Sequence, residues 1–167
     1  MNDYDIWFSI VKLSPKIKLK LINDFHNTQQ IWYYGVHNKK TEYFNNTLIN
    51  VLTNAWNDKE IDNVRRKLEI NEIKSVQYYE EEYPQKLKNY DDAPYTLFYK
   101  GNIMPLNEGY SVSVVGSRKY SNYGKDVTKI ICSDLCANKI NIISGMARGI
   151  DTFARAALIV VDTLVQF

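Results

Sequence analysis

The first 71 residues carry apolar side chains three and four positions apart, which is the period of an amphipathic α-helix. Helices are predicted at 3–12, 15–25, 41–55 and 58–71. A further short helix, capped by Asn27 or Thr28, is expected to end at Gly35 in a left-handed turn. Ser14 and Asn57 precede predicted helices and are typical N-cap residues. The pattern predicts a small helical module over residues 1–71.

After residue 71, short β-branched and aromatic runs replace the helical period. The pattern predicts strands at Lys74–Tyr79 and Tyr95–Tyr99. Val112–Val115 and Ile140–Ile143 are nearly continuous apolar runs, typical of parallel strands buried on both faces. A helix over 123–138 separates these two runs, so the strand–helix–strand order implies a right-handed parallel crossover. The side chains of this helix that we expect to pack on the sheet are Val127, Ile130, Ile131, Cys132 and Leu135. The second part of the chain, residues 72–167, is therefore predicted to be α/β.

Both apolar runs end in a small residue and a glycine, with an arginine close behind. The first turn holds Gly116, Ser117 and Arg118, and the second holds Ser144, Gly145, Arg148 and Gly149. In a parallel sheet both turns emerge at the same carboxyl edge, where ligands bind. Glycine permits close backbone approach to a phosphate, and arginine adds a forked cation. Neither turn is a dinucleotide fingerprint or a Walker A loop, so the residues predict a phosphate site of unspecified ligand. Asp151 is interpreted as a helix-start residue rather than as a ligand contact.

Composition restricts the possible functions only modestly. The net charge of +2 over 167 residues is too small to prove a nucleic-acid partner. No apolar run approaches the roughly 20 residues that span a bilayer, and the N-terminus does not resemble a secretory signal, so we expect a cytoplasmic protein. Cys132 and Cys136 are interpreted as free thiols, and we expect no metal and no cofactor. Lys16, Lys18 and Lys20 are interpreted as a solvated helix face, with a nucleic-acid contact as the alternative.

Several motifs occur in a fixed order in the second part of the chain. They are Tyr83-Pro84-x-x-Leu87, Ala93-Pro94-x-x-Leu97-x-Tyr99-x-Gly101, Val114-Val115-Gly116-Ser117-Arg118, Tyr123-Gly124 and Ser144-Gly145-x-Ala147-x-Gly149-Ile150-Asp151. This order resembles the DNA-processing protein A family, also called DprA or Smf, over roughly residues 73–158. The helical N-terminus is similar to the sterile-alpha-motif-like (SAM-like) domain that precedes the core in many members.

The resemblance implies a Rossmann-like core that binds single-stranded DNA during natural transformation, helps to load the recombinase RecA and is not an enzyme. Carried over by motif, Arg118 and Arg148 would bind DNA phosphates. Gly116, Ser117, Ser144, Gly145 and Gly149 would shape the pocket and offer backbone donors. Full-length members form homodimers, which is doubtful for this chain.

Two departures from the family pattern bear on these expectations. Arg155 stands where the family usually has a histidine, and residues 159–167 do not match the family's next strand. We interpret the chain as a truncated member with an incomplete Rossmann-like sheet, and we expect it to be poorly stable and impaired in recombinase loading; a tail that forms one last strand is the alternative. Two other functions stay open: a related nucleoside-monophosphate hydrolase, although its Pro-Gly-Gly-x-Gly-Thr motif does not occur here, and a non-functional fragment.

Overall fold

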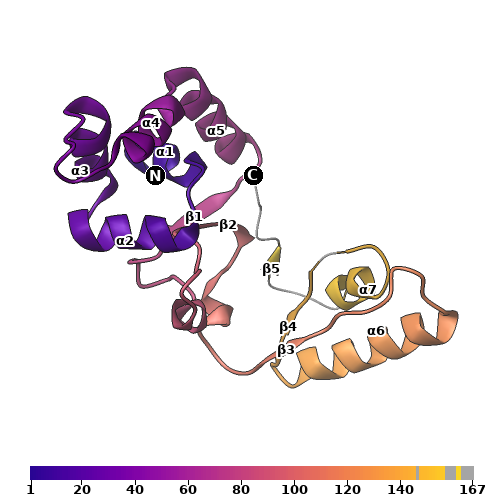
Figure 1. Ribbon diagram of the computed structural model, residues 1–167. Coiled ribbons are helices and arrows are strands. Elements are labelled where there is room, and N and C mark those ends of the chain that lie inside the picture. The colour runs from indigo at the N-terminus through magenta and orange to yellow at the C-terminus, as the bar shows by residue number, and fades with distance from the viewer. Residues whose placement is uncertain (146, 157–160, 163–167) are drawn as a thin grey trace. The chain divides into compact units, whose positions relative to one another are not determined.

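The computed structural model describes residues 1–145, 147–156 and 161–162. The chain divides into two compact units, the first from Met1 to Lys100 and the second from Gly101 to Asp162. The first unit contains α1 (Asp3–Ile10), α2 (Pro15–Phe25), α3 (Thr28–Trp32), the π-helical turn η1 (Tyr33–His37), α4 (Asn46–Ala55), α5 (Asp58–Ile70), β1 (Lys74–Gln77), the 3-10 turn η2 (Gln85–Asn89) and β2 (Thr96–Gly101) (Figure 1). The second contains the 3-10 turn η3 (Met104–Leu106), β3 (Ser111–Ser113), α6 (Asn122–Ala137), β4 (Asn141–Ile143), α7 (Ile150–Ala156) and β5 (Val161–Asp162). The predicted α/β class is confirmed.

None of the helices in the described ranges is long and apolar enough to cross a membrane.

Side-chain caps start each helix from α1 to α6. In each case an asparagine or serine oxygen accepts a hydrogen bond from the backbone N–H three residues later. The caps predicted at Ser14 and Asn57 are confirmed, and Asn27 rather than Thr28 caps α3. The caps satisfy N–H groups that the helix itself leaves unpaired, so the local sequence fixes where these helices begin.

The first unit has one aromatic core to which helices and strands both contribute. Trp7 and Phe8 of α1 are completely buried, and the Trp7 indole donates a hydrogen bond to Leu52 O at 3.1 Å. Tyr95 and Phe98 belong to the same core, and the Tyr95 ring meets Phe8 edge-on at 5.1 Å. The antiparallel strands β1 and β2 therefore complete the helical unit. The run of helices α1 to α5 ends at Ile70, close to the change from helical to strand pattern predicted near Asn71, whereas the compact unit continues to Lys100. The expected division into domains at 71/72 stays a prediction.

One motif residue of this unit has a structural role. Tyr83 is fully buried, and its hydroxyl donates a hydrogen bond to Pro94 O at 2.7 Å. This bond ties the Tyr83-Pro84 segment to the Ala93-Pro94 segment that leads into β2. Burial raises the pKa of Tyr83 to about 12, so the hydroxyl stays a donor over the physiological range.

The left-handed turn predicted at Gly35 is wrong. Gly35 lies inside η1, its φ is not positive, and a Cβ there would lie 2.7 Å from Leu52 Cδ1 and 3.8 Å from the Phe44 ring. The absence of a Cβ lets the Leu52 side chain of α4 pack directly against the Gly35 backbone. Only tertiary packing distinguishes this role from that of a C-terminal cap.

The expected solvated face of α2 is wrong at Lys18. Lys16 and Lys20 are exposed, but Lys18 is 8% exposed, and its Nζ donates to Ser9 O at 2.9 Å. The Lys18 ammonium also lies 5.5 Å from the Phe8 ring centroid. Burial lowers the pKa of Lys18 to about 8.

We expect the first unit to become more stable as the pH rises from 7.5 to about 9.5. The unfolded chain keeps the Lys18 proton up to its ordinary pKa of 10.5, whereas the folded chain releases it near pH 8. Stability therefore rises with pH through this window, by up to about 2 kcal/mol for this group. Urea unfolding followed by tryptophan fluorescence measures the effect, because Trp7, Trp32 and Trp56 all lie in the first unit. Lys18→Met should flatten the pH profile, and an equally steep profile in that variant would contradict the assignment.

The second unit contains the predicted parallel strand pair. Ser111 pairs with Asn141 and Ser113 with Ile143, and the ladder extends to a bond from Val114 N to Ile143 O of 2.8 Å. The predicted adjacency and parallel direction of these two runs are confirmed. Figure 1 shows α6 and α7 beside the pair.

Two details of this unit differ from the prediction. Ile130 and Ile131 are 61% and 50% exposed, because Thr128 and Cys132 form the buried stripe of α6 instead. Val112 and Ile143 are also exposed, at 39% and 45%, so the strands are not covered on both faces within the described residues. Among the described residues, Cys132, Ile142 and Ala154 form a small buried cluster, against which Val114, Leu135 and Cys136 pack. The predicted final strand at 159–165 lies mostly outside the described residues, as does the side chain of Arg155.

Candidate functional site

The two glycine-containing turns lie together at the carboxyl edge of the β3–β4 pair. The first turn follows Val114 and leads to Ser121, the N-cap of α6. The second follows Ile143 and leads into α7. Because the strands are parallel and adjacent, both turns emerge at the same edge, as the sequence predicted.

Backbone contact at Gly149 joins the two turns. Gly149 has a φ of +102°, and a Cβ there would lie 2.2 Å from Ser117 O and 2.7 Å from Arg118 Cα. The next residue, Ile150, donates its backbone N–H to Ser117 O at 3.2 Å. Only glycine permits this conformation and approach. The contact therefore places Arg118 and Arg148 on neighbouring segments of backbone.

Ile150 and Gly116 make a second close contact between the turns. A Cβ on Gly116 would lie 2.6 Å from Ile150 Cβ, so the Ile150 side chain packs directly on the Gly116 backbone. The same side chain approaches the first turn of α6, where a Cβ on Gly124 would lie 3.5 Å from Ile150 Cδ1. Gly116 of the Gly-Ser-Arg motif is thus needed to admit Ile150, whereas a Cβ at Gly124 would make only an ordinary van der Waals contact with it.

Asp151 links the turns through its carboxylate. It is 5% exposed in the first turn of α7, and Gly116 N donates to its Oδ1 at 3.1 Å. Its Oδ2 would lie 3.3 Å from a Cβ on Gly145 in the second turn. Asp151 lies at the start of a helix, as the sequence predicted. The sequence did not predict its hydrogen bond with Gly116, which is 35 residues away. The Gly116 N–H, which was expected to face a ligand, is occupied by Asp151 instead.

Both arginines of the turns are exposed to solvent. Neither Arg118 nor Arg148 forms an ion pair with a carboxylate in the described part of the chain. By contrast, Arg65 of α5 pairs with both Asp3 and Asp62. Two unpaired guanidinium groups at one edge can each donate a bidentate pair of hydrogen bonds to an anion. The arrangement is suited to phosphate groups.

The other residues predicted for the site line the same edge. Ser117 Oγ accepts from Lys119 N at 3.1 Å, which shapes the first turn. Ser144 is half-buried next to Asp151, with its Oγ 3.5 Å from Asp151 O. Their contact with a ligand stays a prediction. Among the described residues, no three His, Cys, Asp or Glu side chains lie close enough together to hold a metal ion.

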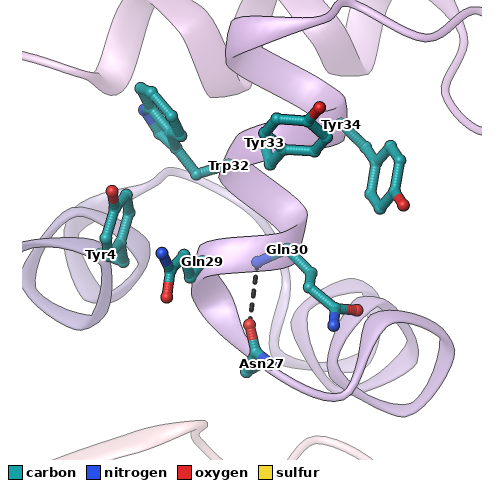
Figure 2. Close-up of a pocket in the computed structure, with 7 residues that line it drawn as sticks. All are labelled: Tyr4, Asn27, Gln29, Gln30, Trp32, Tyr33 and Tyr34. Carbon is teal, nitrogen blue, oxygen red and sulfur yellow. Dashed lines mark hydrogen bonds between the residues drawn. The ribbon is translucent and has the colours of Figure 1, made fainter.

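A separate pocket of about 330 Å³ lies in the first unit beside α3 and η1. Four aromatic rings and three amides line it, from Tyr4, Trp32, Tyr33, Tyr34, Asn27, Gln29 and Gln30 (Figure 2). Asn27 is engaged in capping α3, as the dashed bond to Gln30 N shows. No lysine or arginine lines the pocket, so it does not suit a phosphate ligand. The edge of the β3–β4 pair is the stronger candidate.

The strand–turn edge, with two cations that pair with no carboxylate of the described residues, belongs to an α/β core and suits an anion, and comparison with known proteins specifies the family. The profile of the family "DNA recombination-mediator protein A" matches residues 74–164. The chain therefore belongs to this family. The resemblance to DNA-processing protein A inferred from the motifs is confirmed.

Individual relatives support the same assignment. The chain is 36% identical over 87 residues to "DNA processing protein DprA" of Bacillus subtilis, which covers 52% of this chain and 29% of the relative. It is 34% identical over 151 residues to "Protein Smf" of Borreliella burgdorferi, covering 88% of this chain and 46% of the relative. The X-ray structure of DNA processing protein A from Streptococcus pneumoniae superposes with a TM-score of 0.67 at 28% identity, covering 94% of this chain and 53% of that one. The chain thus spans less than half the length of these curated relatives.

Proposed function

We propose that this chain binds single-stranded DNA through phosphate contacts at the two turns. The observation that carries the proposal is the Gly149 contact, which holds the Arg118 turn and the Arg148 turn together at one edge. The exposed arginines provide the charge, and neither is neutralised by a carboxylate of the described residues. Phosphate contacts of this kind position a strand without reading its sequence.

We propose that the chain acts as a binding module and not as an enzyme. The carboxylate at the site edge, Asp151, is buried and accepts a hydrogen bond from Gly116, so it is placed to hold the turns and not to activate water. This favours DNA binding over the alternative nucleotide hydrolase. The names of the relatives, which are DNA-processing proteins, point in the same direction.

The biological setting is also part of the proposal. The relatives and the family name connect this chain with DNA processing and recombination, and the family resemblance suggests natural transformation with RecA as the partner. Homodimer formation is a further proposal. These activities belong to proteins more than twice the length that the match covers.

A salt titration tests the proposed function. Fluorescence anisotropy with a labelled oligothymidylate should show binding that weakens steeply between about 50 and 200 mM salt. Each neutralised phosphate contributes about −0.7 to the logarithmic slope on a single strand, so two arginines alone give about −1.4. Incubation with nucleoside monophosphates, followed by chromatography, should give no product. Nucleotide turnover without DNA binding would favour the hydrolase instead.

A further inference from the structure

A partly exposed cluster of aromatic and basic side chains, with Tyr120 and Lys129 exposed and Lys125 and Phe153 half-buried, lies where the first turn meets α6 and α7. The Tyr120 ring is 48% exposed and meets the Phe153 ring edge-on, with centroids 4.7 Å apart. The Nζ atoms of Lys125 and Lys129 lie 5.6 Å and 5.8 Å from the centroid of the same Phe153 ring. These four residues, here called the Tyr120 cluster, begin two positions after Arg118.

The cluster carries positive charge that its own fold does not neutralise. Lys125 and Lys129 are four residues apart on α6, so they share one helix face and repel each other. The Phe153 ring attracts both ammonium groups, which holds them together on this face. Neither lysine forms an ion pair or a hydrogen bond with another described side chain. An anion placed between or beside the two ammonium groups would relieve the repulsion.

The Tyr120 ring adds a different kind of contact. Its edge-on packing against Phe153 fixes the ring, while about half of its surface stays open to solvent. A fixed, exposed aromatic ring in a cluster that also carries cations is the arrangement with which proteins bind single-stranded nucleic acid of any sequence, because every base can stack on it. Folded peptides and duplex DNA do not offer an unstacked base to such a ring.

We propose that the Tyr120 cluster extends the DNA path from the two turns along α6. A base stacks on Tyr120, and Lys125 and Lys129 hold the phosphate that follows. This inference rests on the proposed function, and it adds base stacking and a direction to a site otherwise defined by phosphate contacts.

The test combines protein variants with two oligonucleotides of equal length, an oligothymidylate and the same sugar–phosphate chain without bases. Tyr120→Leu should weaken binding of the oligothymidylate roughly 5- to 100-fold and leave binding of the abasic chain unchanged. Tyr120→Phe keeps the ring and should bind both as the original protein does. The double variant Lys125→Gln/Lys129→Gln should reduce the salt slope by about 0.7, the value for the one phosphate that the two lysines hold, for both oligonucleotides.

Matched controls come from the opposite edge of the same strand pair. Tyr110, 82% exposed, precedes β3, and Lys139, exposed with a φ of +58°, precedes β4. Tyr110→Leu and Lys139→Asn should leave binding unchanged; asparagine tolerates the left-handed backbone at 139. Circular dichroism of each variant shows whether the second unit keeps its fold.

The outcomes separate this inference from the function on which it rests. If Arg118→Ala weakens binding of both oligonucleotides but Tyr120→Leu affects neither, or affects both equally, the stacking inference is wrong and the phosphate site stands. If the original protein binds neither oligonucleotide, both proposals are wrong.

Discussion

Replacing Gly149 by alanine is expected to separate the two turns and to unfold the second unit at markedly lower temperature. The φ of +102° is strained for any residue with a Cβ, and the new methyl group would lie 2.2 Å from Ser117 O, which is backbone and cannot rotate away. Strain of this kind costs about 1–3 kcal/mol, and the displaced turn adds the loss of the Ile150–Ser117 and Gly116–Asp151 hydrogen bonds. We expect a total loss of roughly 3 kcal/mol or more.

Gly109→Ala is the matched control for this prediction. Gly109 also has a positive φ, of +66°, but a Cβ there would have its nearest neighbour at 3.8 Å. The Gly109→Ala variant should therefore lose only the stability that the strained backbone costs, about 1 kcal/mol. Circular dichroism follows all the helices, and tryptophan fluorescence reports on the first unit alone, so a loss of helical signal without a change in fluorescence reports on α6 and α7. Equal stability of the two variants would show that the contact between the turns contributes nothing.

Reversal of charge at Arg118 is expected to weaken single-stranded DNA binding roughly 10- to 100-fold at low salt. The change removes a charge-assisted contact of about 1.5–3 kcal/mol and puts a carboxylate beside the phosphate. The loss should be equal for oligonucleotides of different base composition, because phosphate contacts carry no sequence information. Anisotropy titrations with several homopolymeric oligonucleotides measure it.

Two further variants make this result specific. Arg66→Glu makes the same change of net charge on an exposed face of α5 and should have little effect. Arg118→Lys keeps the charge but loses the forked donors, so it should lie between the original protein and the reversal. If Arg118→Glu and Arg66→Glu weaken binding to the same extent, only overall charge matters and Arg118 is not in the site.

Local signals in the sequence were sufficient to predict several helix starts and the two strands that carry the site. The caps at Ser14, Asn57 and Ser121 are satisfied within three residues, so the helix starts could be read from short windows. The apolar runs near Val112 and Ile140 predicted the two parallel strands, and the crossover rule placed both turns at one edge.

Predictions failed where a side chain depends on a distant neighbour. Lys18 has the sequence of a solvated helix position, but the carbonyl of Ser9 and the Phe8 ring enclose it. Gly35 has the sequence of a helix end, but the Leu52 side chain lies where a Cβ at this position would be. Ile130 and Ile131 fail in the opposite sense, because they were predicted to be buried and are exposed. The two-stranded β3–β4 sheet covers only one narrow stripe of α6.

By itself, the sequence determined the family of this protein, its α/β class and the two turns that carry Arg118 and Arg148. Only the tertiary structure decided how the turns are held: Gly149 lies against the Ser117–Arg118 backbone, and Asp151 accepts the Gly116 N–H from 35 residues away. The reason is that turns and caps satisfy hydrogen bonds among near neighbours, which short windows reveal. A contact between two turns exists only after β3 and β4 have paired and α6 has returned the chain to the same edge.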